Sequence, residues 1–120
     1  MDIQERTLSF AVRILKFADK LPKTQAGLVL TKQLVRSGTS VGANMEEADG
    51  AASKNDFINK VTISRKEARE TRYWLCLIQK AELINDPKAK GELKELIQEI
   101  LELMKILSSI IIKAKEKRGY

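Results

Sequence analysis

The chain has 120 residues, a formal net charge of +6 and no histidine, and Leu, Ile, Ala, Lys and Glu dominate its composition. The missing histidine excludes Ser-His-Asp and Cys-His catalysis and histidine-containing zinc or di-iron sites, so we expect no catalytic, metal or cofactor site. A single cysteine, the lack of an apolar run of about 20 residues and the lack of a signal-peptide pattern predict a cytoplasmic protein without membrane contact.

Hydrophobic periodicity and capping residues predict four helices in one domain. They cover about residues 2–20, 24–49, 53–82 and 86–117. Pro22 ends the first helix, Thr24 and Ser53 are suited to cap the second and third, and Asp86 precedes a proline that starts the fourth. Four helices joined by short links predict an all-α, antiparallel up-down-up-down four-helix bundle.

Each helix carries an apolar stripe that we expect to form the core. The inward residues are Phe10, Ile14, Phe17, Leu21, Leu28, Leu34, Val41, Met45, Ala48, Phe57, Val61, Ala68, Leu75, Ile78, Leu93, Ile97, Ile100, Met104, Leu107 and Ile111. The fourth helix carries a second apolar line, made of Leu96, Leu103, Ile106 and Ile110. Because one buried face suffices in a monomeric bundle, this second line predicts a homo-oligomer, with an unrelated partner helix as the alternative.

Two glycines, Gly38 and Gly42, lie one turn apart on one face of the second helix. Each costs about 1 kcal/mol relative to alanine inside a helix, so we expect another helix to approach closely there, with Trp74 as a candidate neighbour. A phosphate-binding loop would need a preceding strand and a lysine after the second glycine, and neither is present.

A seam of polar residues lies beside these glycines: Arg36, Ser37, Ser40, Asn44 and Glu47. Serine and asparagine are poor helix formers, whereas an ordinary exposed face favours Lys, Glu or Gln. We therefore expect a hydrogen-bonded contact with another helix or with another subunit. A solvated surface and a catalytic seam are the alternatives.

Positive charge is concentrated in the third helix and at the end of the fourth. Residues 53–81 hold seven basic and three acidic residues, and residues 113–118 hold four basic residues and one acidic residue. An arginine stripe, Arg65, Arg69 and Arg72, suits phosphates, with a salt-bridged surface as the alternative. The candidate nucleic-acid-binding residues are Lys54, Lys60, Arg65, Lys66, Arg69, Arg72, Lys113, Lys115, Lys117 and Arg118.

Acidic residues form two further groups. The fourth helix has a ladder of glutamates that we expect to face solvent or another subunit: Glu92, Glu95, Glu99 and Glu102. Glu46, Glu47 and Asp49 partly resemble the Glu-Glu-x-x-Glu cluster of helical nucleotide pyrophosphatases, but the third glutamate is missing. A magnesium-dependent nucleotide hydrolase therefore stays the least favoured function.

Three runs carry a resemblance to a known family: Q-L-V-R-S-G-T-S-V-G-A-N-M-E-E-A at 33–48, S-K-N-D-F-I-N-K at 53–60 and K-E-A-R-E-T-R-Y-W-L at 66–75. They resemble the four-helix-bundle 23S rRNA intervening-sequence proteins, from about Phe10 to Ile78, whereas the fourth helix matches only in general character. The resemblance implies a bacterial, ring-like homopentamer without established enzymatic activity. A related branch consists of basic accessory proteins of diversity-generating retroelements, which contact nucleic acid and a reverse transcriptase. The leading hypothesis is thus a non-catalytic bundle that binds structured RNA or DNA, and the alternative is a protein–protein adaptor.

Overall fold

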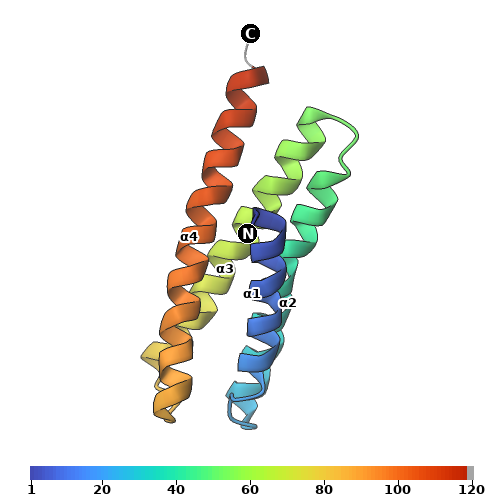
Figure 1. The fold of residues 1–120 in the computed structure, drawn as a ribbon. Helices are drawn as coiled ribbons and strands as arrows, with labels where there is room; N and C mark the ends of the chain where they lie inside the picture. The colour runs from blue at the N-terminus through green and yellow to red at the C-terminus, as the bar shows by residue number, and fades with distance from the viewer. Residues whose placement is uncertain (119–120) are drawn as a thin grey trace.

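The computed structural model describes residues 1–118, which form four α-helices (Figure 1). They are α1 (Ile3–Ala18), α2 (Gln25–Asp49), α3 (Lys54–Lys80) and α4 (Pro87–Arg118). Each helix packs against the next one along the chain, and α4 also packs against α1. Figure 1 shows successive helices running in alternate directions. The all-α, four-helix prediction is confirmed, and each helix begins one residue later than predicted because the predicted ranges included the caps.

The helices begin at polar side chains that accept hydrogen bonds from the first turn. Thr24 Oγ1 accepts from the Gly27 amide at 3.1 Å, and Ser53 Oγ accepts from the Asp56 amide at 3.1 Å. The Asp86 carboxylate accepts from the Ala89 amide at 2.9 Å. Each contact satisfies a backbone donor that has no partner inside its own helix.

The core is built mainly from the predicted stripes, although Phe57, Ile97 and Met104 are only partly buried against it. Leu28 is 54% exposed and Leu30 is buried in its place. The prediction for Leu28 is wrong because it lies six residues before Leu34, whereas Leu30 lies four residues before it, on the same face. Leu96 and Leu103 are 1% and 0% exposed, so they belong to the core. Since α4 contacts both α1 and α3, it buries a wider face than a single stripe.

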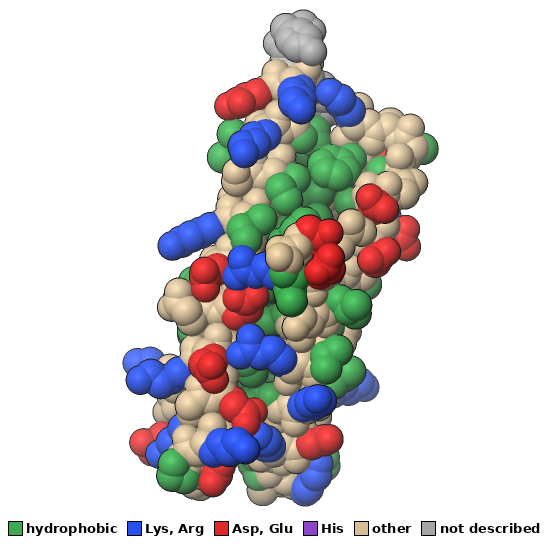
Figure 2. All heavy atoms as spheres, viewed as in Figure 1, with side chains coloured by type: hydrophobic (Ala, Val, Ile, Leu, Met, Phe, Trp, Pro, Cys, Tyr) green, Lys and Arg blue, Asp and Glu red, His purple; other side chains and the backbone are tan. Residues whose placement is uncertain are grey.

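The surplus apolar surface therefore lies mainly on α1 and α2 rather than on α4. We call the exposed residues there the α1–α2 outer face: Leu8, Val12, Leu15, Leu28 and Val29. The three α1 residues follow one another at spacings of four and three, which places them on one stripe. Figure 2 shows hydrophobic side chains along this side of the molecule. Within residues 1–118, none of the helices combines the length and the hydropathy that a membrane crossing requires.

Candidate functional site

The two glycines of α2 lie where this helix packs against α1. A Cβ atom at Gly38 would stand 2.9 Å from Cγ2 of Ile14, and one at Gly42 would stand 3.3 Å from the carbonyl group of Thr7. Ile14 and Thr7 are both buried. The close neighbour is therefore α1, and the choice of Trp74, which lies on α3, is wrong.

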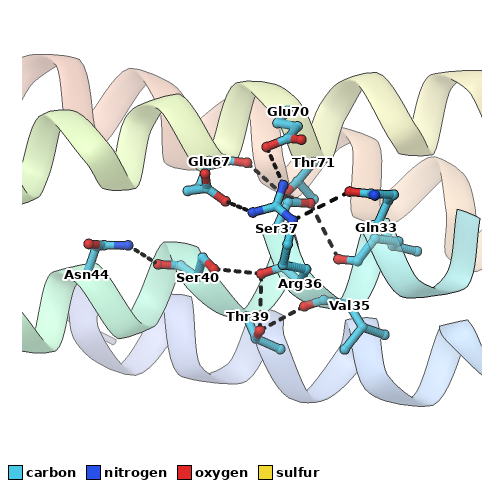
Figure 3. A network of polar contacts seen from close by, with 11 residues as sticks. Gln33, Val35, Arg36, Ser37, Thr39, Ser40, Asn44, Glu67, Glu70 and Thr71 are labelled. Atoms are coloured by element: carbon cyan, nitrogen blue, oxygen red, sulfur yellow. Dashed lines mark hydrogen bonds and ion pairs between the residues drawn. The ribbon is translucent and has the colours of Figure 1, made fainter.

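Arg36 links α2 to α3 (Figure 3). Its guanidinium lies 3.0 Å from a carboxylate oxygen of Glu67 and 2.5 Å from one of Glu70. The hydrogen bond that it donates to Glu70 raises the pKa of Arg36, and the charge of Glu67 raises it further. Because the Arg36 side chain is 47% exposed, each ion pair contributes only about 0.2–1 kcal/mol. The main consequence is that both acidic residues are held on the α2 side of α3.

Buried hydroxyl groups join α2 to α3 beneath Arg36. Thr71 Oγ1 lies 2.9 Å from Ser37 Oγ, and Ser64 Oγ donates to the Val41 carbonyl at 2.7 Å. Ser37, Ser64 and Thr71 are 0% exposed. Ser64 and Thr71 were missed at the sequence level. The available signal was the line of small residues at spacings of four and three that they form with Ala68, because such a line permits close helix approach.

The remainder of the polar seam does not reach another helix. Ser40 Oγ donates to the Arg36 carbonyl at 2.6 Å, and the Asn44 amide donates to the Ser40 carbonyl at 2.8 Å. Both bonds stay within α2. Glu47 is exposed, and its side chain makes no hydrogen bond or ion pair with any described residue. The seam thus contacts α3 at one end and presents polar side chains at its surface at the other.

Replacing Thr71 by valine is expected to lower the free energy of unfolding by about 1–2 kcal/mol, because it removes the buried hydroxyl bonded to Ser37 while keeping the side-chain volume. Thr62→Val is the matched control. Thr62 lies on the same helix, is half-buried, and bonds only to the Ile58 carbonyl of its own helix. Denaturant unfolding measures both variants, and equal losses would contradict a stabilising role for the interhelical pair.

The arginine stripe lies on the α4 side of α3. Arg65 is half-buried and donates to Ser108 Oγ at 3.3 Å, whereas Arg69 and Arg72 are exposed and form no ion pair within residues 1–118. Two acidic residues of α3, Glu67 and Glu70, lie within the sequence range of the stripe, but both are paired with Arg36 on the α2 side. The stripe therefore keeps its positive charge.

The other basic candidates are distributed over α3 and the end of α4. Lys60 is half-buried, and the exposed lysines are Lys54, Lys66, Lys113, Lys115 and Lys117. Arg118 is the last residue of α4, and its side chain lies outside the described part of the structure. Because Arg65 contacts Ser108, the lysines of residues 113–117 lie five to nine residues farther along α4, or about 8–14 Å.

Two members of the glutamate ladder of α4, Glu92 and Glu99, are half-buried and pair with basic residues in or just after α1, which corrects the expectation for them, whereas Glu95 and Glu102 are exposed as expected. Glu99 lies 2.6 Å from Arg6, and Glu102 lies 3.9 Å from the same guanidinium. Glu92 lies 2.6 Å from Lys20. The hydrogen bond to Glu99 raises the pKa of Arg6. These contacts hold α1 against α4, which could not be predicted without knowing the register of the two helices.

The second acidic group lies at the end of α2. Glu46, Glu47 and Asp49 are all exposed there. Among the described residues, no group of three or more acidic or cysteine side chains is placed to hold a metal ion. The geometry offers these carboxylates no shared ligand site.

The chain is similar to one protein family and to a solved structure. The model of a family described as 23S rRNA-intervening sequence protein matches residues 1–109. A crystal structure of a protein with unknown function from the S23 ribosomal protein family of Bacteroides thetaiotaomicron is 42% identical and has a TM-score of 0.82, over 92% of this chain and 98% of that chain. No curated protein matches the chain. The matched range includes most of α4, which resembled the family only in general character at the sequence level.

Proposed function

Because this chain belongs to the family of 23S rRNA-intervening sequence proteins, we propose that it is a non-catalytic, homo-oligomeric bundle that binds structured RNA through its basic faces. The arginine stripe carries this proposal. Arg69 and Arg72 are exposed, and Arg36 holds Glu67 and Glu70 on the other side of α3. An arginine row without acidic partners is suited to bidentate contacts with phosphates.

Recognition is expected to depend on the backbone and shape of the RNA rather than on its base sequence. Tyr73 is the one aromatic residue among residues 1–118 that is both large and more than half exposed, at 60%. Sequence-specific binding of single strands uses several stacking aromatics, whereas double-stranded RNA is bound mainly through phosphates and 2′-hydroxyl groups. The exposed side chains of α3 fit the second mode better.

Self-association is the second part of the proposal. The α1–α2 outer face exposes large apolar side chains that a second copy would cover, and the resemblance implies a ring-like homopentamer. A ring repeats each basic stripe and so converts weak single contacts into avid binding. If the apolar surface served another protein instead, the chain would be an adaptor, such as an accessory protein of a reverse transcriptase. Genomic context separates the two roles: a position inside an rRNA gene favours the first, and a neighbouring reverse transcriptase favours the second.

Salt-dependent RNA binding tests the proposal. Affinity for a structured RNA should fall steeply as salt is added, since each phosphate contact contributes about 0.9 to the log–log slope on duplex DNA. Replacing Arg65, Arg69 and Arg72 together by glutamine should weaken binding and flatten this slope. The control replaces Lys88, Lys90 and Lys94, three exposed lysines of α4, by glutamine and removes the same charge elsewhere.

Light scattering on both triple variants completes the design. Weaker RNA binding with an unchanged mass supports contact through the stripe. A smaller assembly would instead place these arginines at a subunit interface. If both triple variants weaken RNA binding equally, or if salt does not alter the RNA affinity, the proposed contact between RNA and the arginine stripe is wrong.

A further inference from the structure

The position of α1, at one corner of the bundle, is filled over only part of the bundle's length, because α1 is shorter than α4. Helix α1 has 16 residues and α4 has 32. Arg6, near the start of α1, pairs with Glu99 and Glu102, so the last 12 or so residues of α4 extend beyond α1. At about 1.5 Å per residue, this extension is about 18 Å long. Figure 1 shows the N-terminus of α1 midway along the bundle, while α2, α3 and α4 continue past it.

The extension of α4 presents to this corner the same face that contacts α1 lower down. Ile110, Lys113 and Lys117 follow Glu99 by 11, 14 and 18 residues, which are close to whole numbers of helical turns. They therefore continue the line of α4 that begins with the carboxylate bound to Arg6. Ser108, which contacts Arg65, follows Glu99 by nine residues, or two and a half turns. The corner and the arginine stripe thus lie on opposite sides of α4.

The unoccupied corner is an apolar groove with a basic rim. It has a volume of about 390 Å³. We call it the corner groove, lined by Phe57, Ile110 and Ala114 with Lys54, Lys113 and Lys117. The three apolar residues are half-buried and pack against the core from outside it. Figure 2 shows hydrophobic side chains gathered between the upper part of α4 and its neighbours, with lysine or arginine beside them.

We propose that the corner groove binds an acidic amphipathic helix of a partner protein. A helix of about three turns fits the length of the extension, and its apolar stripe would cover the half-buried residues as α1 does lower down. Glutamate or aspartate beside that stripe would face the three lysines. The end of α4 from a second copy would bring Lys113, Lys115 and Lys117 against like charges, and RNA phosphates would contact the lysines of the rim while leaving the apolar floor uncovered. The proposal does not rest on the arginine stripe, which lies on the opposite side of α4.

Peptide binding to the full chain tests this proposal. The probe is a fluorescein-labelled helical peptide of about 14 residues, with a leucine stripe flanked by glutamates, and the control peptide has lysine at every glutamate. Fluorescence anisotropy should show saturable binding of the acidic peptide and binding about tenfold weaker, or weaker still, for the control. Ile110→Gln should weaken the acidic peptide about tenfold, because it removes an apolar contact.

The charged rim is tested separately. The double variant Lys113→Gln, Lys117→Gln should weaken the acidic peptide about fivefold, because exposed ion pairs have modest energies. The matched control, Lys88→Gln with Lys90→Gln, removes equal charge at the other end of α4 and should have no effect. This double variant alters exposed side chains only, so it remains informative even if Ile110→Gln loses stability.

Four results would overturn the proposal. They are no saturable binding of the acidic peptide, equal binding of the lysine peptide, RNA affinity that depends on Ile110, and a change of oligomeric mass in the Ile110→Gln variant. The third would assign the corner groove to RNA and the fourth to a second copy of the chain. Loss of RNA binding in the arginine triple variant, with peptide binding retained, would separate the two proposals.

Discussion

Replacing Gly42 by leucine is expected to lower the free energy of unfolding by about 1–3 kcal/mol, the usual cost of overpacking a close contact. The added Cβ would already stand 3.3 Å from the carbonyl carbon and oxygen of Thr7. Main-chain atoms within α1 cannot move aside as the end of a flexible side chain can. The two helices must therefore separate, and the melting temperature should fall by about 5–15 °C.

The matched control is the same substitution at Gly91. This glycine lies in α4 and is exposed, and a Cβ there would have no neighbour within 4 Å. Leucine should stabilise this position by about 0.5–1 kcal/mol, because it has the higher helix propensity. If the free energy of unfolding falls for Gly42→Leu and rises for Gly91→Leu, contact with α1, rather than helix propensity, decides the effect at Gly42. Similar melting temperatures for both variants would contradict the close helix contact.

The helices and most of the core could be predicted because they depend on local patterns. Caps such as Thr24 and Ser53 act within one turn, and a stripe such as Phe10, Ile14 and Phe17 follows from the helical period alone. Leu28 was misplaced because the first two turns of α2 offer two apolar positions two residues apart, Leu28 and Leu30. The helical period favours Leu30, which lies four residues before Leu34, over Leu28, which lies six residues before it.

Contacts between helices could be predicted less well because they depend on register and on the choice of neighbour. Helix α2 packs against both α1 and α3, and periodicity does not say which of them the glycines approach. The partners of Arg36 are 31 and 34 residues away in sequence, and those of Arg6 are 93 and 96 residues away. Any of several carboxylates on the facing helix would have satisfied the sequence pattern. The corner groove has the same origin, since it results from the point along α4 at which α1 begins.

Replacing Leu8, Val12 and Leu15 together by glutamine is expected to dissociate the proposed homo-oligomer. The three side chains are 66%, 43% and 48% exposed, so the fold of a single chain should tolerate polar replacements. A subunit interface centred on the α1–α2 outer face would lose its apolar contacts. Light scattering should then give the mass of one chain for the variant and a multiple of it for the unchanged protein. Ile112→Gln is the control, because Ile112 is an apolar residue of α4 that is 56% exposed. This variant should keep the molecular mass of the unchanged protein.

The same variant should bind structured RNA about 10²–10⁴-fold more weakly, because a single chain loses the avidity of repeated basic stripes. Glutamine leaves the net charge unchanged, so the loss could not be attributed to weaker electrostatic attraction. The salt dependence should flatten as well, since one stripe contacts fewer phosphates than several. A monomeric variant that keeps full RNA affinity would show that one stripe is sufficient and that the proposed self-association does not serve RNA binding. A monomeric mass for the unchanged protein at micromolar concentration would refute self-association itself, and the exposed apolar stripe of α1 would then have to be assigned to a different protein.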